Sequence, residues 1–86
     1  MNRKIIFLET AVPECERLVS AASAGRLLEL DEVLHRLKGI ALYLHADDIV
    51  ELIQRLEHAD TAEMICSLAM QLRAELTSEA FLARYF

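Results

Sequence analysis

Hydrophobic residues recur along this chain at spacings of three and four, the period of an α-helix with one buried face. The pattern fills four segments, at about residues 3–24, 27–44, 48–58 and 61–76. No segment alternates hydrophobic and polar residues as a half-buried β-strand does. Because short loops join the segments, the sequence predicts an all-α fold, an antiparallel up-down-up-down four-helix bundle, in one domain of residues 1–86.

The first segment contains Pro13, which removes a helical hydrogen bond and crowds the preceding turn. We therefore expect a kink at Pro13 or a new helix start near Val12. Gly25 suits the left-handed residue that ends a helix, and Asp47 suits the N-cap of the third segment. The hydrophobic positions at helical spacing in the third segment are Ile49, Leu52, Ile53 and Leu56. The hydrophobic positions at helical spacing in the first segment are Ile5, Leu8, Ala11, Val12, Cys15, Leu18, Val19 and Ala22.

The last part of the chain is rich in aromatic residues, with Phe81, Tyr85 and Phe86 after the fourth segment. The fourth segment either ends at residues 77–78 or continues through them. We expect a last turn or a short separate helix that packs against the bundle, and Phe7 in the core or as a cap over one end. The hydrophobic positions of the fourth segment are Met64, Ile65, Leu68, Ala69, Leu72 and Leu76.

The second segment places His35 opposite its hydrophobic stripe, since each helical residue advances about 100°. His35 is therefore expected to point at solvent. The residues expected to share its outer face are Asp31, Lys38, Gly39, Leu42 and Ala46. The residues of the opposite, core-facing stripe are Leu30, Val33, Leu34, Leu37, Ile40, Ala41 and Leu44.

A surface histidine acquires a function through its surroundings. Lys38, one turn along the helix, can supply positive charge to an anion held at the imidazole. Gly39 costs a helix about 1 kcal/mol relative to alanine, and it leaves room for another surface to approach. A leucine at position 42, on the solvent-facing side of the helix, is expected if a partner covers it. These neighbours favour a functional role for His35.

The stretch from His35 to Gly39, which reads HRLKG, resembles the H-x-L-K-G motif of histidine-containing phosphotransfer (HPt) domains of bacterial phosphorelays. The chain departs from the family in two places. Family members usually carry glycine or a small residue at the position of His45, and they often carry small residues at the positions of Ile40 and Ala41. The resemblance covers about residues 5–75, through Phe7, Pro13, Glu14, Ala46, Ile49, Leu56 and Glu57.

The resemblance implies that His35 accepts a phosphoryl group from an aspartate of a receiver domain and passes it to a response regulator. Lys38 would neutralise phosphate charge, and Gly39 would let the partner come close. The protein would be a phosphocarrier rather than an enzyme, without a cofactor or metal site, because the Mg²⁺ is expected in the partner receiver. The docking surface implied for the receiver comprises Asp31, Arg36, Leu42 and Ala46.

Composition narrows the classes of function. The 86 residues are 55% hydrophobic, enough for one core, and the net charge is -5 with nine scattered Lys and Arg, which argues against nucleic-acid binding. No apolar run approaches the roughly 18 residues of a membrane span. Cys15 and Cys66 lack the spacing of a zinc or redox motif, so we expect structural thiols. A cytoplasmic, monomeric protein is expected.

Two other functions remain compatible with the sequence. An interaction module with the HPt fold would bind receiver or kinase domains without being phosphorylated, although this chain keeps His35, Lys38 and Gly39 in register. An unrelated helical dimerisation domain would use Leu42 and the C-terminal aromatic residues as its interface. The chain also lacks the extra N-terminal helix common in the family, which favours an excised domain of a hybrid sensor kinase over a free-standing protein.

Overall fold

The structure, a computed structural model, describes residues 2–86 and contains five α-helices in this range. The prediction of an all-α fold is confirmed, since residues 2–86 contain no strand. The helix count differs from the prediction because the C-terminal residues form a fifth helix. Met1, which the predicted domain includes, lies outside the described residues. The helices are α1 (Arg3–Ala24), α2 (Leu27–Tyr43), α3 (Asp47–Glu57), α4 (Ala62–Leu76) and α5 (Glu79–Tyr85).

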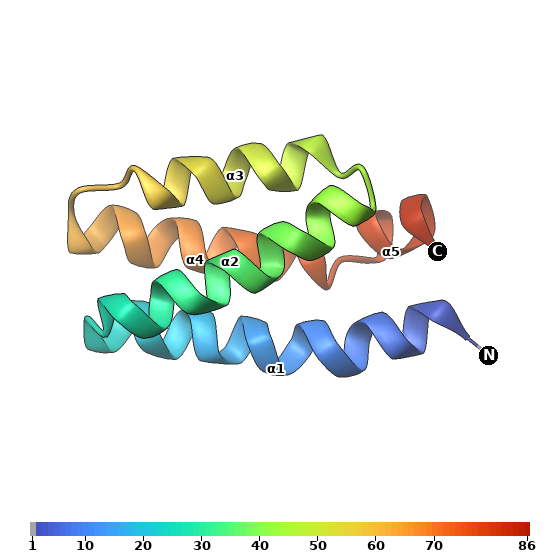
Figure 1. The fold of residues 1–86 in the computed structure, drawn as a ribbon, viewed down its shortest axis with the longest axis horizontal. Coiled ribbons are helices and arrows are strands. Elements are labelled where there is room, and N and C mark those ends of the chain that lie inside the picture. The colour runs from blue at the N-terminus through green and yellow to red at the C-terminus, as the bar shows by residue number, and fades with distance from the viewer. Residues whose placement is uncertain (1) are drawn as a thin grey trace.

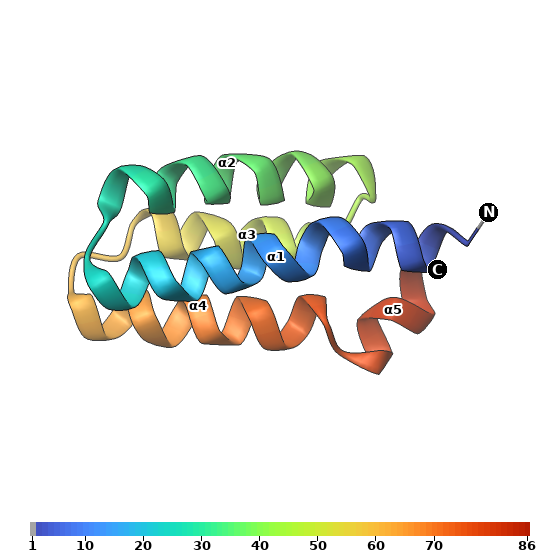
Figure 2. The same cartoon turned by 90° about the horizontal axis from the view of Figure 1, so that it is seen from below.

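The chain reverses direction between successive long helices, as Figure 1 shows. α1 packs against α2, α2 against α3 and α3 against α4, and α4 returns to α1, so that the four helices surround one core. α5 lies at the end of the bundle where both termini are found, beside the N-terminal half of α1 (Figure 2). No helix within residues 2–86 combines the length and apolar character needed to cross a membrane.

α1 continues through Pro13 without a break, so the alternative of a new start near Val12 was wrong. Pro13 cannot donate to the carbonyl of Glu9, and both residues are exposed, so water can satisfy that carbonyl. The helix ends as predicted at Gly25, whose φ is 70° and whose N–H donates to the Ala22 carbonyl at 3.3 Å. Glycine adopts this left-handed conformation without a steric penalty.

The loop before α3 differs from its prediction. Asp47 is the first residue of α3, and Ala46 occupies the cap position instead. The Ala46 carbonyl already accepts a helical hydrogen bond from the Val50 N–H at 3.0 Å, which places the cap one residue earlier than expected. No side chain caps this helix end, although the Asp48 carboxylate accepts from the Ile49 N–H at 3.0 Å.

His45 has a φ of 56°, which makes it the only non-glycine residue with a positive φ among residues 2–86. The Cβ of an L-residue crowds the backbone in this left-handed conformation, at a cost of about 1–2 kcal/mol. Glycine removes that crowding because it has no Cβ. The departure at His45 therefore falls on a turn whose backbone favours glycine.

Replacing His45 with glycine should raise the free energy of unfolding by up to about 1 kcal/mol, because the strained Cβ is removed. Urea denaturation measures the change. His58→Gly is the matched control, since His58 follows α3 at an ordinary φ of -98° and should gain nothing. A His45→Gly chain less stable than the original would contradict this account of the turn.

The core follows the predicted stripes in α2 and α3, but three predicted positions in α1 and α4 are exposed. These are Ile5, Val12 and Met64. In α1 the predicted Ala11 is buried together with Phe7, and Ile5 lies about 160° round the helix from Phe7. The predicted stripe residues buried in α2 and α3 are Leu30, Val33, Leu34, Leu37, Ala41, Ile49, Leu52, Ile53 and Leu56.

α5 is the short separate helix that was one of two expected forms of the aromatic tail. Ser78 caps its N-terminus, because the Ser78 hydroxyl accepts a hydrogen bond from the Phe81 N–H at 3.1 Å. Phe81 is buried, and the Phe7 ring centroid lies 5.8 Å from that of Phe81 and 4.9 Å from that of Phe86. The C-terminal segment therefore packs on α1. Phe7 belongs to the core and also contacts the aromatic rings that cover this end of the bundle.

Candidate functional site

His35 lies on the outer face of α2, and its side chain is exposed. Leu34 and Leu37, on the reverse of the helix, are buried, so the predicted orientation is confirmed. The His35 ring makes no hydrogen bond to any atom of residues 2–86. Both of its nitrogens are thus open to solvent and to an approaching group.

Lys38 leans from α2 toward α3, where its Nζ lies 3.4 Å from Glu57 Oε1. The two side chains are 32% and 37% exposed. An ion pair this exposed contributes only about 0–1 kcal/mol. Lys38 can therefore leave Glu57 at little cost when an anion arrives at the neighbouring imidazole of His35.

Arg36 points the other way, toward α1. Its Nε donates a hydrogen bond to Glu14 Oε1 at 3.0 Å, and this bond raises the pKa of Arg36 above its ordinary value. Arg17 also approaches Glu14 Oε1, at 3.8 Å, while Glu14 Oε2 is buried without a hydrogen-bond partner within residues 2–86. His35 therefore stands between a cation held against α3 and a cation held against α1.

Gly39 is exposed one turn along α2 from His35. A Cβ built on Gly39 meets no atom of residues 2–86 within 4 Å beyond its own helix. Packing inside the described chain thus gives no reason for glycine, although glycine weakens a helix by about 1 kcal/mol relative to alanine. The gap beside His35 is consistent with the close approach of another molecule.

The structure exposes two of the other predicted docking residues and buries a third. Asp31 and Leu42 lie open to solvent on α2. Ala46 is fully buried, so its prediction as a docking residue was wrong. The prediction for Ala46 assumed that the helix continues to residue 46. It fails because α2 ends at Tyr43 and the left-handed turn at His45 directs the chain into the core.

A hydrophobic groove beside Gly39 was missed by the sequence reasoning. It has a volume of about 470 Å³ and lies between α1 and α2, at the end closed by the C-terminus. Three segments far apart in the sequence supply its walls, which is why helical periodicity does not reveal it. The apolar and aromatic residues that line it are Ile6, Phe7, Ile40, Tyr43, Leu44 and Phe86.

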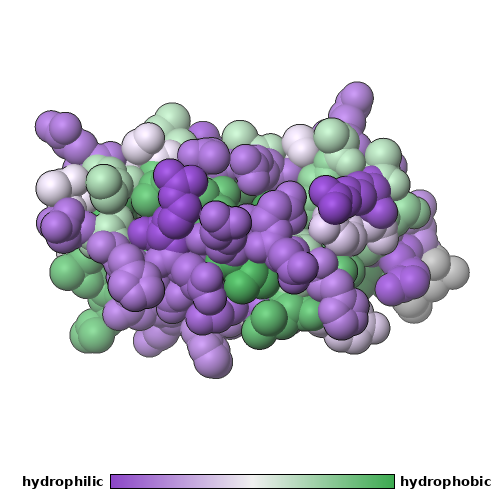
Figure 3. Space-filling model, turned by 90° about the horizontal axis from the view of Figure 1, so that it is seen from above, coloured by the Kyte–Doolittle hydropathy of each residue, from purple (hydrophilic) through white to green (hydrophobic). Residues whose placement is uncertain are grey.

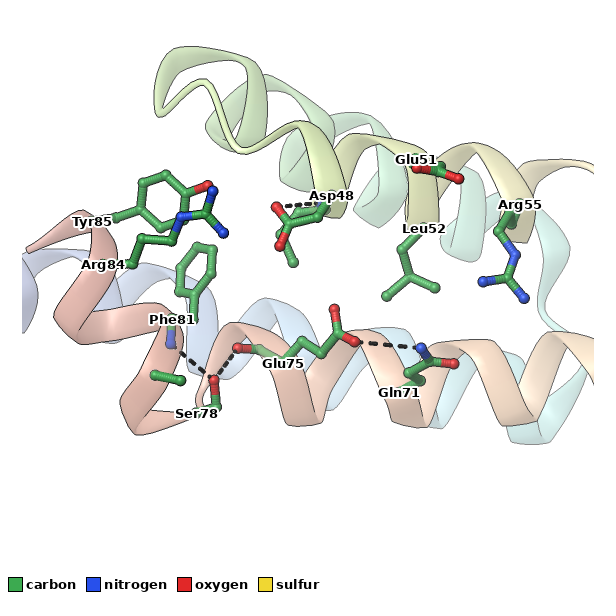
Figure 4. Close-up of a pocket in the computed structure, with 12 residues that line it drawn as sticks. Asp48, Glu51, Leu52, Arg55, Gln71, Glu75, Ser78, Phe81, Arg84 and Tyr85 are labelled. Atoms are coloured by element: carbon green, nitrogen blue, oxygen red, sulfur yellow. Dashed lines mark hydrogen bonds between the residues drawn. The ribbon is translucent and has the colours of Figure 1, made fainter.

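A second hollow, of about 420 Å³, lies between α3, α4 and α5 (Figure 4). Charged side chains of both signs line it, including Asp48, Arg55, Glu75 and Arg84. The adjoining face over α3 is mostly hydrophilic (Figure 3). α2 contributes no lining residue, so this hollow is separate from the surface that carries His35.

The remaining candidates for metal or nucleophile chemistry do not gather into a site. Within residues 2–86, no three His, Cys, Asp or Glu side chains are placed to hold a metal ion. The His58 ring is engaged through Nδ1 with the Gln54 carbonyl at 2.7 Å. Burial raises the pKa of the Cys15 thiol to about 11, so that it stays protonated and inert at neutral pH, and Cys66 is half-buried.

Comparison with known proteins bears on this geometry. A family model described as Hpt domain matches residues 4–80 of the 86-residue chain. No curated protein and no solved structure gives a significant match. The matched range contains His35, Lys38, Gly39 and Glu57, whereas it stops within α5 before Phe86.

Proposed function

This chain belongs to the Hpt domain family, and from that premise we propose that it carries phosphoryl groups in a two-component phosphorelay. His35 accepts the group from an aspartate of a receiver domain and passes it to a response regulator. The observation that carries the proposal is the exposed His35 ring, free of hydrogen bonds to residues 2–86, with Lys38 and Gly39 one turn away. We expect a monomer in the cytoplasm.

In the proposed reaction, the lone pair of a His35 ring nitrogen forms an N–P bond while the O–P bond to the receiver aspartate breaks. The aspartate leaves as a carboxylate. The phosphoimidazole then gives the group to the aspartate of a second receiver by the reverse bond changes. The chain emerges unchanged after both steps and acts as a carrier.

Phosphoryl transfer depends mainly on in-line positioning and on neutralising charge that spreads over three oxygens. The receiver's Mg²⁺ and lysine would supply most of that charge. Lys38 would add one positive charge. To do so, it would leave its ion pair with Glu57 and contact the phosphoryl oxygens instead. The receiver would contact three exposed residues of α2 that surround His35, namely Asp31, Arg36 and Leu42.

Lys38→Ala should slow phosphoryl transfer to His35 about 10-fold, which corresponds to the loss of one charge-assisted contact. Glu57→Gln should change the rate less than about 5-fold, because the exposed pair holds Lys38 only weakly. Quench-flow measurement of transfer from a phosphorylated receiver gives both rates. Lys4→Ala removes an exposed cation from α1 and serves as the control. A Lys38→Ala chain that reacts at the original rate would refute the role of Lys38.

Gly39→Ala should raise the free energy of unfolding by about 0.5–1 kcal/mol and yet slow transfer from the receiver. The added methyl meets nothing in the free chain but occupies the space left for the partner. Gly25→Ala is the matched control: its φ of 70° predicts lower stability, with transfer unchanged. A Gly39→Ala chain that is more stable than the original and accepts phosphate from the receiver at the original rate would contradict the role of Gly39 in partner approach.

The proposal is tested by mixing the chain with receiver domains of the same organism that have been phosphorylated with acetyl phosphate. Acid-labile, base-stable label on the chain is the expected result. Receiver binding without any label would instead support the alternative, an interaction module that is not phosphorylated. Sedimentation at several concentrations separates both from a helical dimerisation domain.

A further inference from the structure

We infer that Glu14 of α1 is a positioning residue for receiver recognition, which holds Arg36 of α2 so that the terminal nitrogens of its guanidinium meet a carboxylate of the receiver. This inference rests on the proposed function, because it adds a residue to the machinery around His35. Glu14 lies on a different helix from His35 and would touch neither the receiver nor the phosphoryl group.

The Glu14 carboxylate lies between α1 and α2, and its side chain is only 16% exposed. Its Oε1 accepts a hydrogen bond from Arg36 Nε at 3.0 Å, and its Oε2 is buried without a partner within residues 2–86. A carboxylate withdrawn from water depends on a nearby cation, because removing that cation leaves a buried charge uncompensated. Glu14 therefore holds Arg36 more firmly than Glu57, which is 37% exposed, holds Lys38.

A row of alternating charges keeps this carboxylate available to Arg36. Arg17 is the competing cation, since its Nη1 lies 3.8 Å from the same oxygen of Glu14. Arg17 is also drawn to a second carboxylate, because its Nε lies 3.5 Å from Glu29 Oε1. Glu29 is fixed in turn by Arg26, whose Nε donates to Glu29 Oε2 at 2.7 Å. The shortest contact with Glu14 is thus left to Arg36.

The free end of Arg36 indicates what it binds. Arg36 meets Glu14 through Nε alone, so its terminal nitrogens have no hydrogen-bond partner among residues 2–86, and the side chain is 42% exposed. Guanidinium groups bind carboxylates in a directed, planar geometry, and a group already held in place loses less freedom on binding. Successive helical residues point about 100° apart, so Arg36 faces a group beside the imidazole of His35 rather than the phosphoryl group on it.

The test measures transfer at increasing concentrations of the phosphorylated receiver that labels the chain fastest. Arg36→Gln should raise the KM for this receiver about 10-fold through loss of a charge-assisted contact, and Glu14→Gln should raise it about 5-fold because Arg36 is no longer held. Glu14→Gln should change nothing further in the Arg36→Gln chain, since Glu14 acts through Arg36. The rate at saturating receiver should stay within about 2-fold of the original.

Three measurements separate positioning from folding. Glu14→Asp keeps the charge on a shorter side chain, so the KM should rise less than in Glu14→Gln. Glu16→Gln removes an exposed carboxylate of α1 that lies 3.7 Å from Arg73, and it should leave the KM within about 2-fold of the original. Phosphoramidate, which phosphorylates imidazole without a protein partner, should label His35 at the original rate in every variant.

A Glu14→Gln chain with an unchanged KM would overturn the inference, and so would an equal rise in the original and in the Arg36→Gln chain. Slower labelling of Glu14→Gln by phosphoramidate would also overturn it, because Glu14 would then support the helix or the imidazole instead of receiver recognition. An equal rise in Glu16→Gln would assign the effect to the general charge of α1. The proposed function fails separately, if neither phosphoramidate nor any receiver labels the original chain.

Discussion

A His35→Gln chain should accept no phosphoryl group from a phosphorylated receiver, a fall in rate of at least about 10³-fold. Glutamine keeps a polar side chain, but its amide nitrogen lacks the nucleophilic lone pair of imidazole. The His35 ring makes no hydrogen bond within residues 2–86, so the free energy of unfolding should change by less than about 0.5 kcal/mol. Rapid-quench transfer assays and urea denaturation measure the two quantities.

The other histidines provide matched controls for this substitution. His45 occupies the left-handed turn after α2, and His58 is bonded to the Gln54 carbonyl at the end of α3. His45→Gln and His58→Gln should therefore accept phosphate at the original rate. Label that persists in His35→Gln and disappears from either control would move the phosphoacceptor to another residue.

Phe7→Ala should lower the free energy of unfolding by about 3–5 kcal/mol, the usual cost of removing a buried phenyl ring. Phe7 packs against Phe81 and Phe86 at centroid distances of 5.8 and 4.9 Å, so α5 also loses its contact with α1. Urea denaturation gives the global loss. Hydrogen exchange should show that the amides of residues 79–86 lose protection first.

Phe86→Ala is the natural comparison, because Phe86 is partly exposed and should cost about 1 kcal/mol or less. Equal losses for the two substitutions would mean that Phe7 is not the residue on which the C-terminal helix depends. Retained protection of residues 79–86 in Phe7→Ala would contradict the packing of α5 on α1.

Much of the fold could be predicted because α-helices have a fixed period. The angular arithmetic for α2 holds from Leu30 to Ala41, where the helix is regular, and it places His35 correctly on the surface. It fails at Ala46, because the helix ends at Tyr43 and the following turn changes direction. Periodicity predicts which residues share a face only as far as the helix continues.

The edges of the hydrophobic stripes were also predicted less well than their centres. Met64 follows the helical spacing of α4, yet it is exposed in the first turn of that helix. In α1, Phe81 and Phe86 pack on Phe7, so that the buried stripe includes Phe7 while Ile5 is exposed. Which edge of a stripe is buried depends on where the neighbouring helices lie.

The site was partly predictable from local sequence. His35, Lys38 and Gly39 lie within five residues, and the family to which their motif pointed is confirmed by the match over residues 4–80. The contact of Lys38 with Glu57 joins residues 19 positions apart, and the groove joins α1, α2 and Phe86. Such features arise only when the helices pack, so no short-range pattern contains them.

The most direct test of the central claim is NMR of the chain with ¹⁵N-labelled histidine after phosphorylation by a receiver. We expect one of the three imidazole rings, that of His35, to show a large ¹⁵N shift and coupling to ³¹P, while His45 and His58 stay unchanged. A phosphoryl group on any other residue, or a stable receiver complex in which no ring is phosphorylated, would contradict the assignment of this chain as a phosphocarrier that acts through His35.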